Sequence, residues 1–260
     1  GGGVLFVPII GGFFPFHIDF VRGTGLLVAL CGALAAGPGL LKSNLANLRL
    51  AMPMALIAST MAIVGAMVGL SLPSHLIELS LGITILLIVL IMLLAKNSDI
   101  PNVKKADSLS TALQITGIYN EPSLNRNISW KIHRTWAGLF SFIIIGFMAG
   151  MFGLGAGWAN VPVLNLMMGA PMKVSVATSK FLLSITDTSA AWIYLNKGAV
   201  IPILVVPSLV GIMLGSFVGV QILKIAKPSF IRWMVIVILL FAGLKAISKG
   251  LEHYGLIFFI

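Results

Sequence analysis

The segment GAGWANVP at residues 155–162 repeats the segment GGGVLFVP at residues 1–8, at a constant offset of 154 residues. The same offset aligns further pairs without a gap: Thr24 with Thr178, Pro53 with Pro207, and Gly65 with Gly219. Apolar segments interrupted by glycine and proline at equivalent places in two halves are typical of membrane transporters, where they mark the central binding site. The duplication therefore predicts two structural repeats and indicates where a ligand would bind.

Composition places the chain in a lipid bilayer. Hydrophobic residues make up 58% of the 260 residues and charged residues only 9%, which leaves too little polar surface for a water-soluble protein. Several apolar segments reach or approach the roughly 20 residues of a membrane-spanning helix: 25–41, 51–70, 79–95, 137–151 with its flanks, 202–223 and 230–247. These segments are continuous, which disfavours a transmembrane β-barrel. We predict an all-α, polytopic membrane protein.

Charge and motifs exclude several classes of function. The net charge of +10 comes from Lys and Arg in the connections, without a basic stripe or nucleic-acid-binding motif, so we expect no nucleic acid partner. The four histidines and the single Cys31 show no metal-ligand spacing, which predicts no metal and no cofactor. Neither a nucleophile with its base nor a phosphate-binding loop is present, so we expect a non-enzyme that does not use ATP by itself.

The chain divides into a first transmembrane repeat at 1–95, a polar linker at 96–135 and a second transmembrane repeat at 136–260. Two β-permissive runs in the linker, 112–119 and 128–133, predict a small hairpin. The linker is the connection richest in Lys and Arg, so we place it in the cytoplasm. An apolar segment precedes the second glycine motif but not the first, so we expect a first helix before residue 1.

Loop charges predict that the repeats are inverted. In the first half, connection 42–49 is basic and connection 71–78 has no Lys or Arg. In the second half the order is reversed: the connection equivalent to 42–49, at 196–200, has a single Lys, whereas the connection equivalent to 71–78, at 224–232, has three basic residues. Equivalent loops thus prefer opposite sides of the membrane, as an inverted repeat with an odd number of crossings requires. Each repeat then has about four to five helices, and a parallel repeat is the alternative.

An odd number of crossings requires that the glycine-rich segment itself enters the bilayer. Residues 156–169 are too few for a full span, so we predict a broken half-helix there and an equivalent one at 2–16.

The glycines themselves are the first candidate binding residues: Gly1, Gly2 and Gly3 in one motif, Gly155 and Gly157 in the other. Without side chains they let the backbone approach a ligand, and free N–H groups at the start of a half-helix favour an anion. Close packing of helices is the alternative, because small residues let membrane helices touch. Duplication at matched positions favours the binding interpretation.

Ionisable residues in an apolar segment are costly and usually functional. Lys180 and Asp187 lie at helical spacing on one face, whereas the residues at the equivalent positions of the first repeat are apolar. We expect Lys180 to contact the substrate and Asp187 to carry a proton or balance charge. The alternatives are a structural Lys–Asp pair and a Lys180 that extends to the membrane interface.

Other polar residues near the same motifs complete the candidate site: Arg22, Thr24, Asn160, Thr178 and Ser179. A guanidinium suits an oxyanion, although Arg22 could simply pair with Asp19. Asn160 could donate to a ligand, cap a helix or bond between helices. We predict that the glycine motifs, Thr24, Thr178, Ser179 and Lys180 surround one cavity near the middle of the membrane, where Lys180 or Arg22 supplies the positive charge.

The segments GGGVLFVP at 1–8 and GFMAGMFGLGAGWANVP at 146–162, followed by VATS at 176–179, resemble the paired signatures of the TauE/SafE family of sulfite and organosulfonate exporters. The resemblance covers both apolar halves. It implies a secondary transporter or permease that exports a small sulfur oxyanion, such as sulfite or sulfoacetate, across the plasma membrane of a prokaryote. Alternatives are a permease for another small anion and a non-transporting membrane protein, such as an assembly factor or an intramembrane enzyme. Small-residue faces also permit a homodimer.

Overall fold

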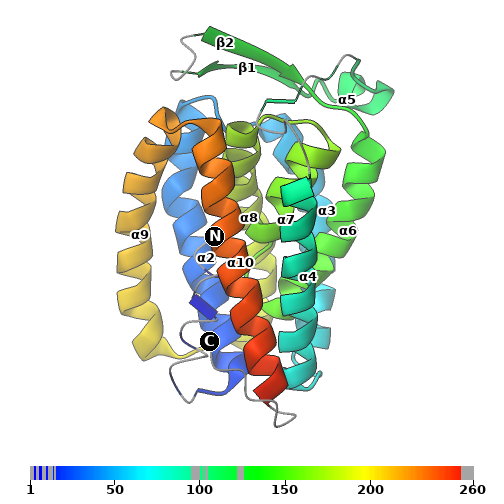
Figure 1. Ribbon diagram of the computed structural model, residues 1–260. Coiled ribbons are helices and arrows are strands. Elements are labelled where there is room, and N and C mark those ends of the chain that lie inside the picture. Colours follow the sequence, from blue (N-terminus) through cyan, green and yellow to red (C-terminus); the bar gives the residue numbers. More distant parts are fainter. Residues whose placement is uncertain are drawn as a thin grey trace.

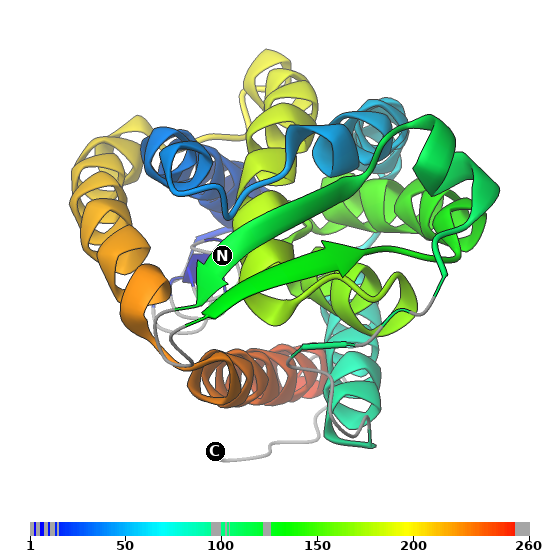
Figure 2. The same cartoon turned by 90° about the horizontal axis from the view of Figure 1, so that it is seen from above.

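The computed structural model describes residues 16–94, 105–121 and 126–252, together with residues 3, 6, 7, 10, 14, 100, 101 and 103. Most of these residues form a bundle of long helices, and a β-hairpin lies across one end of the bundle (Figures 1 and 2). The elements are α2 (Ile18–Lys42), α3 (Leu48–Gly69), α4 (Ser74–Leu94), α5 (Ser108–Ala112), β1 (Thr116–Glu121), β2 (Arg126–Lys131), α6 (Thr135–Phe152), α7 (Gly157–Pro162), the π-helical turn η2 (Val163–Met167), α8 (Met172–Asn196), α9 (Pro202–Ile225) and α10 (Pro228–Glu252).

Six of the described helices are long and apolar enough to cross a membrane: α2, α3, α4, α6, α9 and α10. Helix α8 is equally long, with 25 residues, but it carries more polar residues, and it runs from the middle of the bundle, where most of it is buried, to the edge (Figure 2). Exposed apolar side chains such as Ile203 and Leu214 of α9 form an outer surface suited to lipid. The prediction of an all-α, polytopic membrane protein is confirmed.

Two hydrogen bonds join the repeats in a reciprocal way. The hydroxyl oxygen of Thr24 accepts from the backbone N–H of Ile201, and that of Thr178 accepts from the N–H of Asn47, both at 3.1 Å. The 154-residue offset converts one pair into the other, so a two-fold operation relates the halves. Helices α2 and α8 run in opposite directions, as do α3 and α9 and also α4 and α10 (Figure 1). The predicted inverted repeat is therefore confirmed.

Helix packing depends on small residues. Helix α6 packs along α3, where a Cβ on Gly150 would clash with the carbonyl oxygen of Ala62. Helix α4 packs along α10, where a Cβ on Gly82 would lie 2.5 Å from Ile247. Membrane helices have no strong hydrophobic drive to associate, so such backbone contacts stabilise the bundle. The predicted first helix lies outside the described residues and stays a prediction.

The linker forms the predicted hairpin, with different bounds. Strands β1 and β2 are antiparallel, with Thr116 opposite Lys131 and Glu121 opposite Arg126. Strand β1 begins four residues later than predicted because residues 108–112 form α5, whose first turn is capped by Asp107. The carboxylate of Asp107 also accepts from the N–H and hydroxyl of Thr135, at 2.8 Å each. One acidic residue thereby joins the linker to the start of α6.

Candidate functional site

The second glycine motif reverses the chain inside the bundle. Gly153 ends α6 with φ of 64° and Gly155 follows with φ of 71°, values that favour glycine. The six residues of α7 and the five of η2 then lead back toward the start of α6, where the N–H of His133 donates to the carbonyl of Met168 at 3.0 Å. The predicted broken half-helix is confirmed here. Most of its counterpart at 2–16 lies outside the described residues.

The two glycine motifs meet. A Cβ atom on Gly3 would clash with the carbonyl oxygen of Leu154 and would lie 3.1 Å from the carbonyl oxygen of Gly25. A Cβ atom on Gly25 would lie 2.6 Å from the side chain of Val7 and 3.7 Å from the carbonyl oxygen of Gly153. We call this region the glycine junction (Gly3, Gly25, Gly153, Leu154 and Gly155). Its backbones are in van der Waals contact, which supports close packing. Gly1 and Gly2 lie outside the described residues, and a role of the motif in binding stays a prediction.

Asp187 of α8 lies directly against the glycine junction. A Cβ on Gly155 would lie 2.6 Å from Oδ2 of Asp187 and 3.1 Å from the side chain of Leu183, so only glycine leaves room for the carboxylate. Asp187 is fully buried. Within the described part of the chain, neither carboxylate oxygen has a hydrogen-bond partner.

Lys180 lines a cavity of about 390 Å³ between α2, α8, α9 and α10. It is the only charged residue among the described residues that line this cavity, and most of the others are apolar. The hydroxyl of Ser216 donates to the carbonyl of Gly32 at 3.0 Å. No described residue forms a hydrogen bond or ion pair with the ammonium group of Lys180. Its repeat equivalent, Leu26, is buried among apolar side chains, so only one repeat carries the charge.

Arg22 is bound by protein acceptors. Its guanidinium pairs with Asp19 and donates to the carbonyl oxygens of Gly69 and Met151, at 3.0 Å each. These carbonyls end α3 and α6, where cations are favourable. Only 1% of the Arg22 side chain is exposed. The arrangement supports the alternative interpretation, in which Arg22 pairs with Asp19, and the two carbonyl contacts also hold the start of α2 against two helix ends.

The remaining candidates in the described part of the chain do not line the cavity at Lys180. Thr24 bonds to the residue before α9 and Thr178 to the residue before α3, and these two helices begin at opposite ends of the bundle (Figure 1). Gly157 is the first residue of α7. Asn160 is buried, with Oδ1 lacking a hydrogen bond within the described residues, and Ser179 is buried as well. Of the predicted side chains in the described part of the chain, Lys180 alone lines the cavity between α2, α8, α9 and α10.

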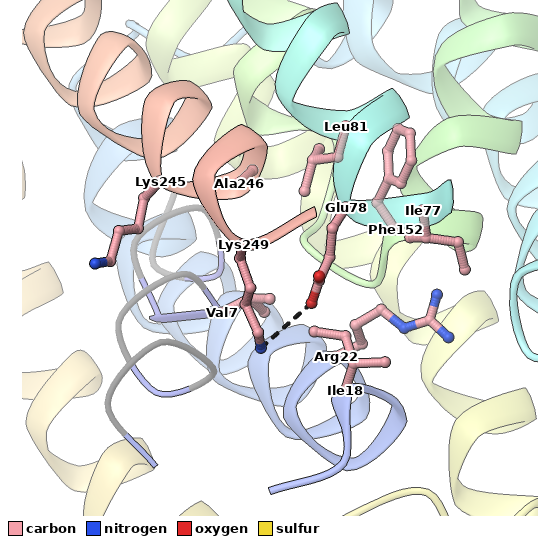
Figure 3. Close-up of a pocket in the computed structure, with 10 residues that line it drawn as sticks. All are labelled: Val7, Ile18, Arg22, Ile77, Glu78, Leu81, Phe152, Lys245, Ala246 and Lys249. Carbon is pink, nitrogen blue, oxygen red and sulfur yellow. Dashed lines mark ion pairs between the residues drawn. The ribbon is translucent and has the colours of Figure 1, made fainter. Parts of the chain in front are cut away.

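A second, much smaller cavity of about 20 Å³ lies near the other end of the bundle. Its charged lining residues are Arg22, Glu78, Lys245 and Lys249 (Figure 3). The ammonium of Lys249 lies 3.2 Å from the carboxylate of Glu78, while the charged ends of Arg22 and Lys245 point away. Sequence reasoning missed Glu78. Its signal was available, because it is the only acidic residue in the apolar helix α4.

Comparisons with known proteins agree with the fold. The family model described as Sulfite exporter TauE/SafE matches residues 1–246. The probable membrane transporter protein YunE of Bacillus subtilis (strain 168) is 26% identical over 114 residues, which cover 44% of this chain and 42% of that protein. The match thus spans less than half of the curated relative. No solved structure matches the chain.

Proposed function

The chain belongs to the sulfite exporter TauE/SafE family of membrane proteins, and from this premise we propose that it is a secondary transporter or permease that exports a small sulfur oxyanion. Sulfite and organosulfonates such as sulfoacetate are the proposed substrates, and the membrane is the plasma membrane of a prokaryote. The linker hairpin lies on the cytoplasmic side, because the linker carries the densest Lys and Arg of any connection.

Lys180 in its cavity is the observation that carries this proposal. A volume of about 390 Å³ lies within the range of small-molecule sites, about 300 to 1,000 Å³. Lys180 has no hydrogen-bond or ion-pair partner among the described residues. A buried cation in a membrane protein needs a counter-charge, which a small anion supplies. At 4 Å and an effective dielectric constant of about 20 the attraction is about 4 kcal/mol. Even a third of that value corresponds to about a tenfold change in affinity.

Inverted repeats offer a route for the anion to the other side. Alternating access in such folds is rocking of one repeat against the other around a fixed site. The cavity at Lys180 reaches Phe230 on the linker side, and the small cavity at Glu78 and Lys249 lies near the opposite end. We propose that rocking opens the second cavity as the first one closes.

Flux through proteoliposomes tests the proposal. We expect the purified protein to pass sulfite or a small sulfonate at least tenfold faster than protein-free liposomes, with chloride, sulfate and a neutral sugar as comparison solutes. The Lys180→Met variant should lose at least nine-tenths of this flux. Lys197→Met is the matched control, because Lys197 is exposed just after the same helix and its loss should leave flux unchanged. If no anion of the panel moves, the proposed function is wrong.

A further inference from the structure

Asp187 is a buried carboxyl group that anion binding at Lys180 leaves unexplained. It is fully buried, in contact with Gly155, and its two oxygens lack hydrogen-bond partners within the described residues. An ionised carboxylate in such a place is very costly, so a buried group of this kind binds a proton or another cation.

The distribution of charge around Asp187 points to Lys180 as its partner in function. Asp187 is seven positions after Lys180, so the two residues share one face of α8 about 10 Å apart along the helix. The elements packed against α8 contribute these charged or titratable residues: Asp19, Arg22, Cys31 and Lys42 from α2, Arg49 from α3, and Arg232, Lys245, Lys249 and Glu252 from α10; α6, α7 and η2 have none. On α8 itself the others are Lys173 and Tyr194. Along α8, Lys180 is the charged residue nearest to Asp187.

The space around Asp187 suits a proton better than a metal ion. A Cβ on Gly155 would already lie within 2.6 Å of one carboxylate oxygen and 3.2 Å of the other, and the apolar side chain of Leu183 closes the same side. Hard metal cations require several oxygen ligands at once. The described residues contain no group of three or more acidic, histidine or cysteine side chains that could hold a metal.

We infer that Asp187 binds a proton that travels with the anion held at Lys180. The inference rests on the proposed transport function and deepens it by naming the coupled ion. Binding the anion and the proton together adds no net charge to the buried region, whereas binding either alone does. One proton moves with each monovalent anion, in the same direction. Coupling of this kind is reciprocal, so each ligand promotes binding of the other.

Proton movement during anion flux is the first test. A small alkanesulfonate is the substrate, because it stays ionised and carries no proton itself, and a pH-sensitive dye reports the proton. In the wild-type protein an imposed pH gradient should accelerate sulfonate flux at least tenfold, with proton movement in the same direction. Asp187→Asn should abolish both effects. Flux in the wild type without proton movement, flux driven by sodium, or coupling retained in Asp187→Asn would overturn the inference.

Infrared spectroscopy provides a readout that needs no transport. At neutral pH the wild-type protein should show a carbonyl band of a protonated carboxyl group, which is absent in Asp187→Asn and shifted in Asp187→Glu. Glu78→Gln is the matched control, because Glu78 lies in α4 but has Lys249 as its ion-pair partner, and its removal should leave the band intact. Absence of the band in the wild type overturns the inference. If only the proposed transport function is wrong, the wild-type protein should show the protonated carboxyl band of Asp187 but no anion flux.

Discussion

The Lys173→Met substitution should be strongly destabilising, because Lys173 forms a buried ion pair that joins the linker hairpin to the bundle. Its ammonium group lies 2.8 Å from the carboxylate of Glu121 and 3.2 Å from the carbonyl oxygen of Lys224. The two side chains are 1% and 0% exposed, so solvent does not screen the pair. Removing one partner of such a pair leaves a buried charge and typically costs about 3 to 5 kcal/mol. We expect a loss of this size.

Reversible unfolding in mixed detergent micelles measures this loss. The double variant Lys173→Met with Glu121→Leu removes both charges and should recover most of it. Lys227→Met is the control, since Lys227 is exposed, and its free energy of unfolding should change by less than about 0.5 kcal/mol. The reasoning is refuted if Lys173→Met costs less than about 1 kcal/mol, or if the double variant is as unstable as the single one.

Three further predictions concern stability. Thr24→Val and Thr178→Val should each cost about 1 to 2 kcal/mol in unfolding experiments and add in the double variant, because each leaves a backbone N–H unpaired; a strongly unequal pair would contradict the equivalence of the repeats. Gly150→Ala should cost about 1 to 3 kcal/mol by pushing α6 from α3, and an unchanged melting temperature would contradict this packing. Burial alone would raise the pKa of Asp107, but its hydrogen bonds outweigh burial and lower it. The stability that the Asp107 carboxylate contributes is therefore complete above its pKa in the unfolded chain, about 3.9. This stability is lost as the pH falls through its lower pKa in the folded protein. Melting curves of Asp107→Asn at different pH should lack this loss.

The architecture could be predicted because it is encoded in local patterns. The length of the apolar segments predicts the spanning helices, the offset of 154 residues predicts the repeat, and the charges of the loops predict its inversion. The glycine motif predicts the half-helix, because the residues between Gly157 and Pro171 are too few for a full span. None of these signals needs knowledge of which segments touch.

The partners of individual side chains could not be predicted, because they depend on contacts between distant segments. Arg22 is bound by helix ends 47 and 129 residues away, and Lys173 pairs with Glu121, 52 residues away. Spacing within one helix did place Lys180 and Asp187 on one face. It could not show that Lys180 faces a cavity while Asp187 faces Gly155.

The position of a bound anion tests the central claim most directly. A small sulfonate that carries bromine can be located by anomalous scattering in crystals grown from lipid. We predict a peak in the cavity between α2, α8, α9 and α10, with a sulfonate oxygen within hydrogen-bond distance of the ammonium group of Lys180, and no peak in Lys180→Met crystals. A peak elsewhere, at the glycine junction or beside Arg22, that persists unchanged in Lys180→Met would contradict the account.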